Sequence, residues 1–157
     1  MINHYQFRND VVKPALKAVG MYSFAAEQLM VGTAAVESNL HFLRQWPSGP
    51  ALGLFQMESA TYQWLVGEYL DRKPEIRAKF LRLTTTGDRF PDPEEMIWNM
   101  RFAAAMCRLR YWVVPEALPD GDDVMALGEY WKTHYNTISG AGTAAKFFNA
   151  FPKVEAY

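Results

Sequence analysis

A glutamate at the end of an apolar helical pattern constrains this chain more than any other feature. Glu37 directly follows Ala34, Ala35 and Val36, in a stretch that Ser23 is placed to cap. A carboxylate next to these apolar residues is either a surface group at a helix end or an acid kept protonated by burial. The residues expected to form the buried face of this helix are Phe24, Ala25, Gln28, Leu29, Gly32, Ala35 and Val36.

A loop and a short extended segment follow this helix. Pro47, Ser48, Gly49 and Pro50 forbid its continuation. The next residues, around 50–57, fit a short β-hairpin or an extended segment, and we expect little other β structure.

The rest of the pattern predicts further helices. The clearest start is Asp92-Pro93-Glu94-Glu95, in which Asp92 is the expected N-cap, Pro93 the first helical residue and Glu95 the partner in a capping box. Asp10 is the expected N-cap of the first helix, and Gly20 its stop. The predicted helices cover about 10–18, 23–37, 59–70, 74–83, 92–112 and 143–150, with a further helix that Asp122 or Asp123 starts and that runs to about Thr133. The fold class is therefore mainly α.

Composition and charge limit the classes of function. The chain has 157 residues, half of them apolar, which is enough for one domain over residues 1–157 with a packed core. Its net charge is −1 and neither sign forms a long run, so we expect no nucleic acid and no membrane surface as partner. Cys107 is the only cysteine and is expected to be a buried hydrophobe. We expect no metal ion and no cofactor.

Three short motifs occur in order along the chain. They are Glu37-Ser38, then Gly53-Leu54-Phe55-Gln56-Met57, then Trp131-Lys132-Thr133-His134-Tyr135-Asn136. Together they resemble the Glu-Ser, Gly-Leu-Met-Gln and Ala-Tyr-Asn motifs of the soluble lytic transglycosylase family. The stretch from Asp92 to Asn99 also resembles a helix of that family, so the resemblance covers roughly residues 23–148.

The resemblance implies a lysozyme-like, transglycosylase-type helical fold and a set of site residues. Glu37 is implied as the catalytic residue. The substrate-binding residues implied are Ser38, Gly53, Leu54, Gln56, Met57, Tyr135 and Asn136. Tyr135 is expected to hydrogen-bond near the catalytic carboxyl, with Asn136 supporting its turn. Pro50, Phe55, Ser59 and His134 depart from the family pattern, which puts the shape of the subsites in question and leaves the reaction class unchanged.

The reaction implied is cleavage of the MurNAc–GlcNAc β-1,4 bond of peptidoglycan with formation of 1,6-anhydroMurNAc. Most glycosidases use two carboxylates, yet between Ser38 and Tyr69 the only acids are Glu58 and Glu68. Glu58 is interpreted as a carboxylate near a helix start. Two alternatives stay open: a hydrolase resembling goose-type lysozyme and acting as an endolysin, and a catalytically silent tail component that binds glycan.

The expected partners are peptidoglycan glycan strands and the tail or baseplate proteins of a bacteriophage. The N-terminal residues have no apolar leader pattern and no run of 18 apolar residues occurs, so we expect synthesis in the host cytoplasm without a signal peptide. Peptidoglycan lies outside the membrane, so a virion that carries the enzyme to the host periplasm and cell wall would resolve the conflict.

Two regions lie outside these motifs. His41 and Trp46 are interpreted as loop packing, because Trp is usually buried, with stacking on a sugar as the alternative. Residues 71–91 are interpreted as an insertion specific to this protein.

Overall fold

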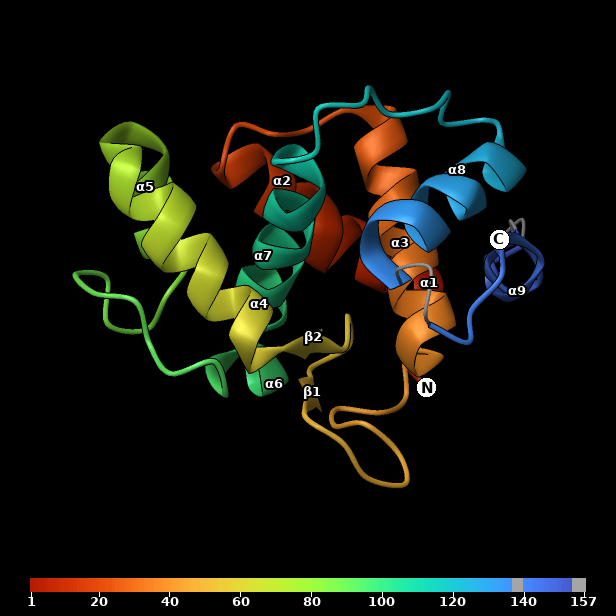
Figure 1. The fold of residues 1–157 in the computed structure, drawn as a ribbon, viewed down its shortest axis with the longest axis horizontal. Coiled ribbons are helices and arrows are strands. Elements are labelled where there is room, and N and C mark those ends of the chain that lie inside the picture. Colours follow the sequence, from red (N-terminus) through yellow and green to blue (C-terminus); the bar gives the residue numbers. More distant parts are fainter. Residues whose placement is uncertain (137–139, 154–157) are drawn as a thin grey trace.

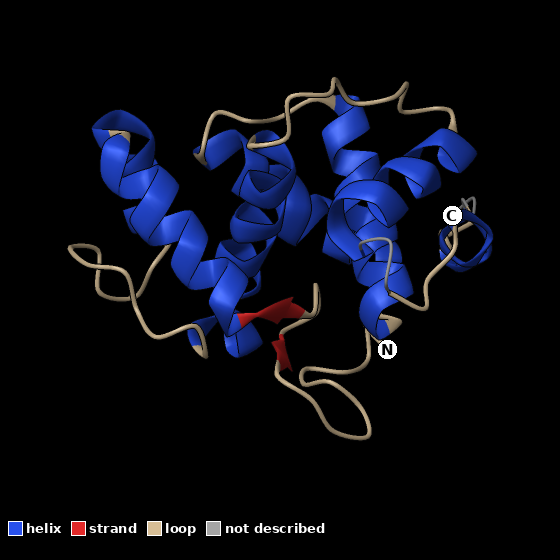
Figure 2. Ribbon diagram, in the orientation of Figure 1, coloured by secondary structure: helices blue, strands red, loops and turns tan. Residues whose placement is uncertain are grey.

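The computed structural model describes residues 1–136 and 140–153, which form a mainly helical structure with a small two-stranded antiparallel sheet (Figures 1 and 2). The α-helices are α1 (His4–Gln6), α2 (Lys13–Ala18), α3 (Phe24–Ser38), α4 (Ser59–Trp64), α5 (Pro74–Leu81), α6 (Glu95–Trp98), α7 (Met100–Trp112), α8 (Val124–Trp131) and α9 (Ala144–Ala150). Continuing them are the π-helical segments η1 (Phe7–Val12), η2 (Leu65–Tyr69) and η4 (Lys132–Asn136) and the 3-10 turn η3 (Leu70–Arg72). The strands are β1 (Ala51–Leu52) and β2 (Met57–Glu58). The predicted mainly α class with a short hairpin is confirmed.

Local capping signals located several helices correctly. The Ser23 hydroxyl accepts a hydrogen bond from the backbone N–H of Ala26 at the start of α3. In the same way Asp123 caps α8 and Thr143 caps α9. Each of these side chains satisfies a backbone N–H that the helix itself cannot pair, so the start of the helix is encoded within a few residues.

Helix α3 is buried on nearly all sides, which the prediction of one apolar face missed. It contacts α7, α8 and α9, and Figure 1 shows it between α2 and α7 on one side and α8 and α9 on the other. Residues 29–35 are all buried, whereas Phe24, placed on the expected face, is 49% exposed. Small residues allow this close packing: a Cβ atom at Gly32 would lie 2.1 Å from the ring of Phe147 on α9. A helix enclosed all round loses the amphipathic pattern that periodicity detects.

The predicted helix start at Asp92 is wrong. Glu95 does not complete a capping box; its carboxylate accepts hydrogen bonds from the backbone N–H and hydroxyl of Thr85 and from the Asn99 amide. The helix breaks at Asn99, whose side chain caps a new helix, α7, by accepting from the N–H of Phe102. The carboxylate therefore connects Thr85 of the preceding loop to Asn99 instead of capping the start of its own helix.

The first helix begins earlier than predicted. Asn3, not Asp10, caps it, and the helical path continues through η1 into α2. Pro14 lies inside this path and has no N–H to donate to the carbonyl of Asp10, four residues earlier. Arg101 Nε donates to that carbonyl at 3.0 Å. A side chain from α7 thus replaces the missing helical hydrogen bond.

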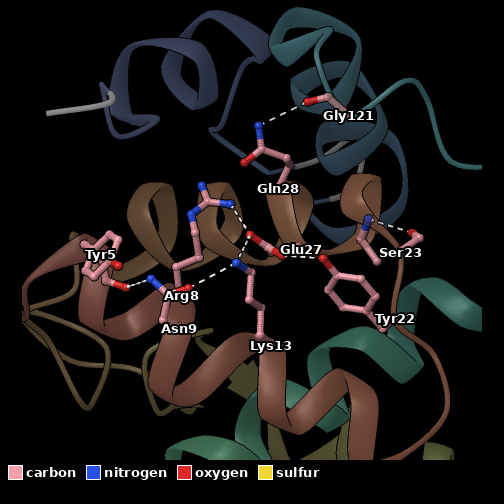
Figure 3. A network of polar contacts seen from close by, with 10 residues as sticks. Tyr5, Arg8, Asn9, Lys13, Tyr22, Ser23, Glu27, Gln28 and Gly121 are labelled. Carbon is pink, nitrogen blue, oxygen red and sulfur yellow. Dashed lines mark hydrogen bonds and ion pairs between the residues drawn. The ribbon is translucent and has the colours of Figure 1, made fainter. Parts of the chain in front are cut away.

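A buried carboxylate holds the N-terminal helical segment against α3. Glu27 is 2% exposed, and Figure 3 shows Arg8, Lys13 and Tyr22 converging on it. Arg8 donates at 2.6 Å, the Tyr22 hydroxyl donates at 2.9 Å, and Lys13 Nζ lies at 3.8 Å. Because the charge is nearly out of water, it depends on these partners for compensation.

We predict that Glu27→Gln lowers the free energy of unfolding by about 2 kcal/mol, since Arg8 and Lys13 lose their anion. Urea unfolding followed by circular dichroism measures the change. Glu68→Gln is the matched control: the Arg72–Glu68 distance is also 2.6 Å, but these side chains are 70% and 53% exposed, so its effect should stay below about 0.5 kcal/mol. Equal losses in the two variants would contradict the role of burial.

Candidate active site

The β-hairpin is shaped by backbone geometry that only certain residues allow. Leu52 pairs with Met57 and Ala51 with Glu58, which leaves residues 53–56 as the turn. Gly53 has φ +71°, and a Cβ atom there would lie 2.3 Å from the carbonyl oxygen of Met96. Both facts require glycine at this position. Gln56 has φ +50°, and both its backbone N–H and its side-chain amide donate to the carbonyl of Gly53.

A cleft of about 660 Å³ lies beside this hairpin and the C-terminal end of α3. Its lining comes from α3, the loop of residues 39–50, the hairpin, α4, α7 and η4. The lining residues are Glu37, Phe42, Gln45, Trp46, Ala51, Gln56, Met57, Glu58, Thr61, Arg110, Tyr135, Asn136 and Gly140. The cleft therefore brings together five of the residues predicted from sequence: Glu37, Gln56, Met57, Tyr135 and Asn136.

Glu37 is a partly buried carboxyl group in this cleft. Burial raises its pKa from 4.5 to about 7, while the hydrogen bond from Trp131 lowers it. The Trp131 indole N–H donates to Glu37 Oε1 at 2.9 Å. Near neutral pH such a group exists in both protonation states, as a general acid or base requires.

Tyr135 and Asn136 lie on the π-helical segment η4, a helix type that is frequent at functional sites. The Tyr135 hydroxyl donates to the carbonyl of Phe55 at 2.7 Å and so ties η4 to the hairpin. The hydrogen bond to the Glu37 carboxyl comes from Trp131, whereas the Tyr135 hydroxyl bonds to the backbone of the hairpin. Asn136 accepts from Lys132 Nζ at 3.0 Å and from the N–H of Gly142 at 3.2 Å, an arrangement that supports its turn.

Ser38, Gly53 and Leu54 do not line the cleft. The Ser38 hydroxyl is buried and donates to the carbonyl of Ala34 within α3. Leu54 is 2% exposed and packs in the core. These residues therefore lie behind the lining of the cleft, at the end of α3 and in the turn of the hairpin.

Sequence reasoning missed or misjudged several lining residues. Glu58 is the N-cap residue of α4, as expected for a carboxylate near a helix start, although its side chain makes no capping hydrogen bond. It also lines the cleft, which its sequence context did not indicate. Trp46 is 73% exposed, so its interpretation as loop packing is wrong. Trp131 was part of the third motif, but its role on Glu37 could not be assigned because the two residues are far apart in the sequence. Arg110 also lines the cleft, from the last turn of α7.

Neither a metal-binding cluster nor a membrane-spanning helix occurs within the described residues. Over residues 1–136 and 140–153, no group of three or more His, Cys, Asp or Glu side chains lies where it could hold a metal ion. None of the helices in this part of the chain is long and apolar enough to cross a membrane. Cys107 is fully buried, as predicted, and burial raises the pKa of its thiol well above the ordinary value.

No protein family, curated protein or solved structure was found to match this chain.

We predict that the stability of the protein depends on pH through Glu37. A folded-state pKa of about 7 against an ordinary 4.5 means that the folded state holds this proton longer than the unfolded chain. The stabilisation is complete below pH 4.5 and is lost as the pH rises through 7. Between pH 4 and 8 the unfolding free energy of Glu37→Gln should therefore rise relative to the wild type by about 3 kcal/mol in total. The change falls between the two pKa values, 4.5 and about 7, where the slope is roughly 1.4 kcal/mol per pH unit.

Chemical unfolding at several pH values tests this, with Glu58→Gln as a control because Glu58 is exposed. The control should run parallel to the wild type. If Glu37→Gln also runs parallel, Glu37 titrates as an ordinary surface carboxylate.

Proposed function

We propose that this protein is a lytic transglycosylase that cleaves the MurNAc–GlcNAc bond of peptidoglycan, with Glu37 as its catalytic residue and a lysozyme-like fold. The observation that carries the proposal is the Glu37 carboxyl, which faces a cleft and has a pKa raised by burial to about 7. The resemblance of the three motifs supports it, since their Glu37, Gln56, Tyr135 and Asn136 line the same cleft.

The proposed reaction uses one carboxyl group twice. Protonated Glu37 donates its proton to the glycosidic oxygen, and the bond between this oxygen and C1 of the muramoyl sugar breaks. Ionised Glu37 then takes the proton of the C6 hydroxyl, whose oxygen forms a new bond to C1 and closes the 1,6-anhydro ring. No water is consumed, and the carboxyl regains its proton. The tethered hydroxyl has an effective concentration that water does not match.

Trp131 has a positioning role in this scheme. Its indole N–H holds one oxygen of Glu37 and favours the ionised form, which keeps the pKa from rising further. An acid whose pKa lies near the working pH can both donate and accept a proton at useful rates.

A second candidate function is hydrolysis, and one observation favours it. Glu58 lines the cleft that contains Glu37, and no intramolecular hydrogen bond occupies its carboxylate within the described chain. An inverting hydrolase needs a second carboxylate to activate water on the far side of the sugar. The product and the effect of Glu58 variants separate the two reactions.

We predict that Glu37→Gln lowers the rate of peptidoglycan cleavage by roughly 10²–10⁴-fold, because the amide has no proton to donate. Glu58→Gln should retain most of the activity. Mass spectrometry of the digest, without borohydride reduction, should find fragments lighter by one water than hydrolytic muropeptides. Reducible ends together with loss of activity in Glu58→Gln would mean hydrolysis. Binding of glycan without any cleavage would mean a silent glycan-binding component.

For delivery, we propose that the tail or baseplate of a bacteriophage carries the protein to the cell wall, because its proposed substrate lies outside the cytoplasmic membrane. We predict that mass spectrometry of purified particles of the encoding phage finds its peptides at a constant ratio to tail proteins. Peptides present in the lysate and absent from the particles would favour the endolysin role.

A further inference from the structure

Two exposed aromatic rings lie in the loop between α3 and β1, at the cleft that contains Glu37. Phe42 is 38% exposed and Trp46 is 73% exposed, and both line the cleft. Their rings are stacked, with centroids 6.2 Å apart and an angle of 14° between the planes. Leaving a large indole in water forgoes the stabilisation that its burial would give, so packing of the fold does not explain the position of Trp46.

The loop that presents these rings is held by backbone hydrogen bonds to the hairpin. The N–H of Gly53 donates to the carbonyl of Leu43 at 2.9 Å, and the N–H of Gln45 donates to the carbonyl of Ala51 at 3.1 Å. Arg44 forms an antiparallel bridge with Leu52, so this part of the loop continues the small sheet. Residues 43–45, which lie between Phe42 and Trp46, are thus held against the hairpin, so the segment that connects the two rings is ordered by the small sheet.

His41 supports the ring of Phe42, and side chains that line the cleft can form hydrogen bonds with a ligand. The edge of the His41 ring meets Phe42, with centroids 4.9 Å apart and an angle of 89°. Around the cleft, Gln45, Gln56 and Asn136 contribute uncharged amides. A flat apolar surface bordered by amides matches a pyranose, which has an apolar C–H face and a rim of hydroxyl and acetamido groups.

Other ligand classes fit this lining less well. A nucleic acid strand would need several cations along its phosphates, and Arg110 is the single cation among the described lining residues. A lipid chain would need a continuous apolar wall, which the amides, Glu58 and Thr61 interrupt.

We propose that Phe42 and Trp46 form an aromatic platform on which one sugar ring of the glycan stacks, at a subsite next to the bond presented to Glu37. The identity of the glycan rests on the proposed function; the platform itself requires only that a saccharide binds in the cleft. Trp46 supplies the contact with the sugar, and Phe42 positions Trp46 by stacking.

Binding of the N-acetylglucosamine tetramer, measured by isothermal titration calorimetry in the Glu37→Gln protein, tests the platform without any turnover. Adding Trp46→Ala should weaken binding about tenfold, and Trp46→Phe should recover most of the loss because it keeps a flat ring. Trp98→Ala is the matched control, since Trp98 is 59% exposed and does not line the cleft; it should bind as the parent does. Circular dichroism and urea unfolding check that all variants fold.

Unchanged binding in Trp46→Ala, equal losses in Trp46→Ala and Trp98→Ala, or no measurable binding of the tetramer by the parent would each overturn the platform. Failure of the proposed function has a different signature. Tetramer binding that depends on Trp46 in a protein that does not cleave peptidoglycan would leave the platform standing and overturn the transglycosylase. Cleavage of peptidoglycan together with unchanged tetramer binding in Trp46→Ala would overturn the platform and leave the transglycosylase standing.

Discussion

The hydrogen bond from the Trp131 indole to the Glu37 carboxyl is the contact on which the rest of the site depends. It joins the end of α3 to the end of α8, and its donor is held by the core, since Trp131 is 2% exposed and packs against Phe147. The carboxyl is thus placed by the same packing that keeps the helices together. Burial withholds water from the carboxyl and raises its pKa, and the indole N–H limits that rise.

How much of the fold could be predicted depends on how far apart in the sequence the interacting residues lie. Ser23, Asp123 and Thr143 cap helices with bonds to residues three positions away, and the sequence displays such pairs directly. At Asp92 the expected capping box failed because the carboxylate of Glu95 accepts hydrogen bonds from Thr85 in the preceding loop and from Asn99. The start at Asp10 failed for another reason, because Asn3 already caps a helical path that runs through this position.

The residues of the cleft also divide into those with a local sequence signal and those without one. Glu37, Gln56 and Tyr135 were found from short motifs, and all three line the cleft. The exposure of Trp46 and the position of Glu58 could not be predicted, because no local pattern states which side of a loop or strand faces a cavity that distant elements enclose. Ser38 neighbours Glu37 in the chain, yet the turn of the helix directs its hydroxyl to the carbonyl of Ala34.

The contact of Gly53 with α6 has a consequence for how this protein can vary over evolution. The close approach is to the carbonyl oxygen of Met96, a main-chain atom that every amino acid supplies. Exposed side chains on α6, such as Trp98, can therefore change without moving the wall of the cleft that the hairpin forms. Substitutions on the outer surface of α6 are therefore independent of the backbone contact that shapes the hairpin, so the molecule can acquire new surface properties while its cleft keeps one shape.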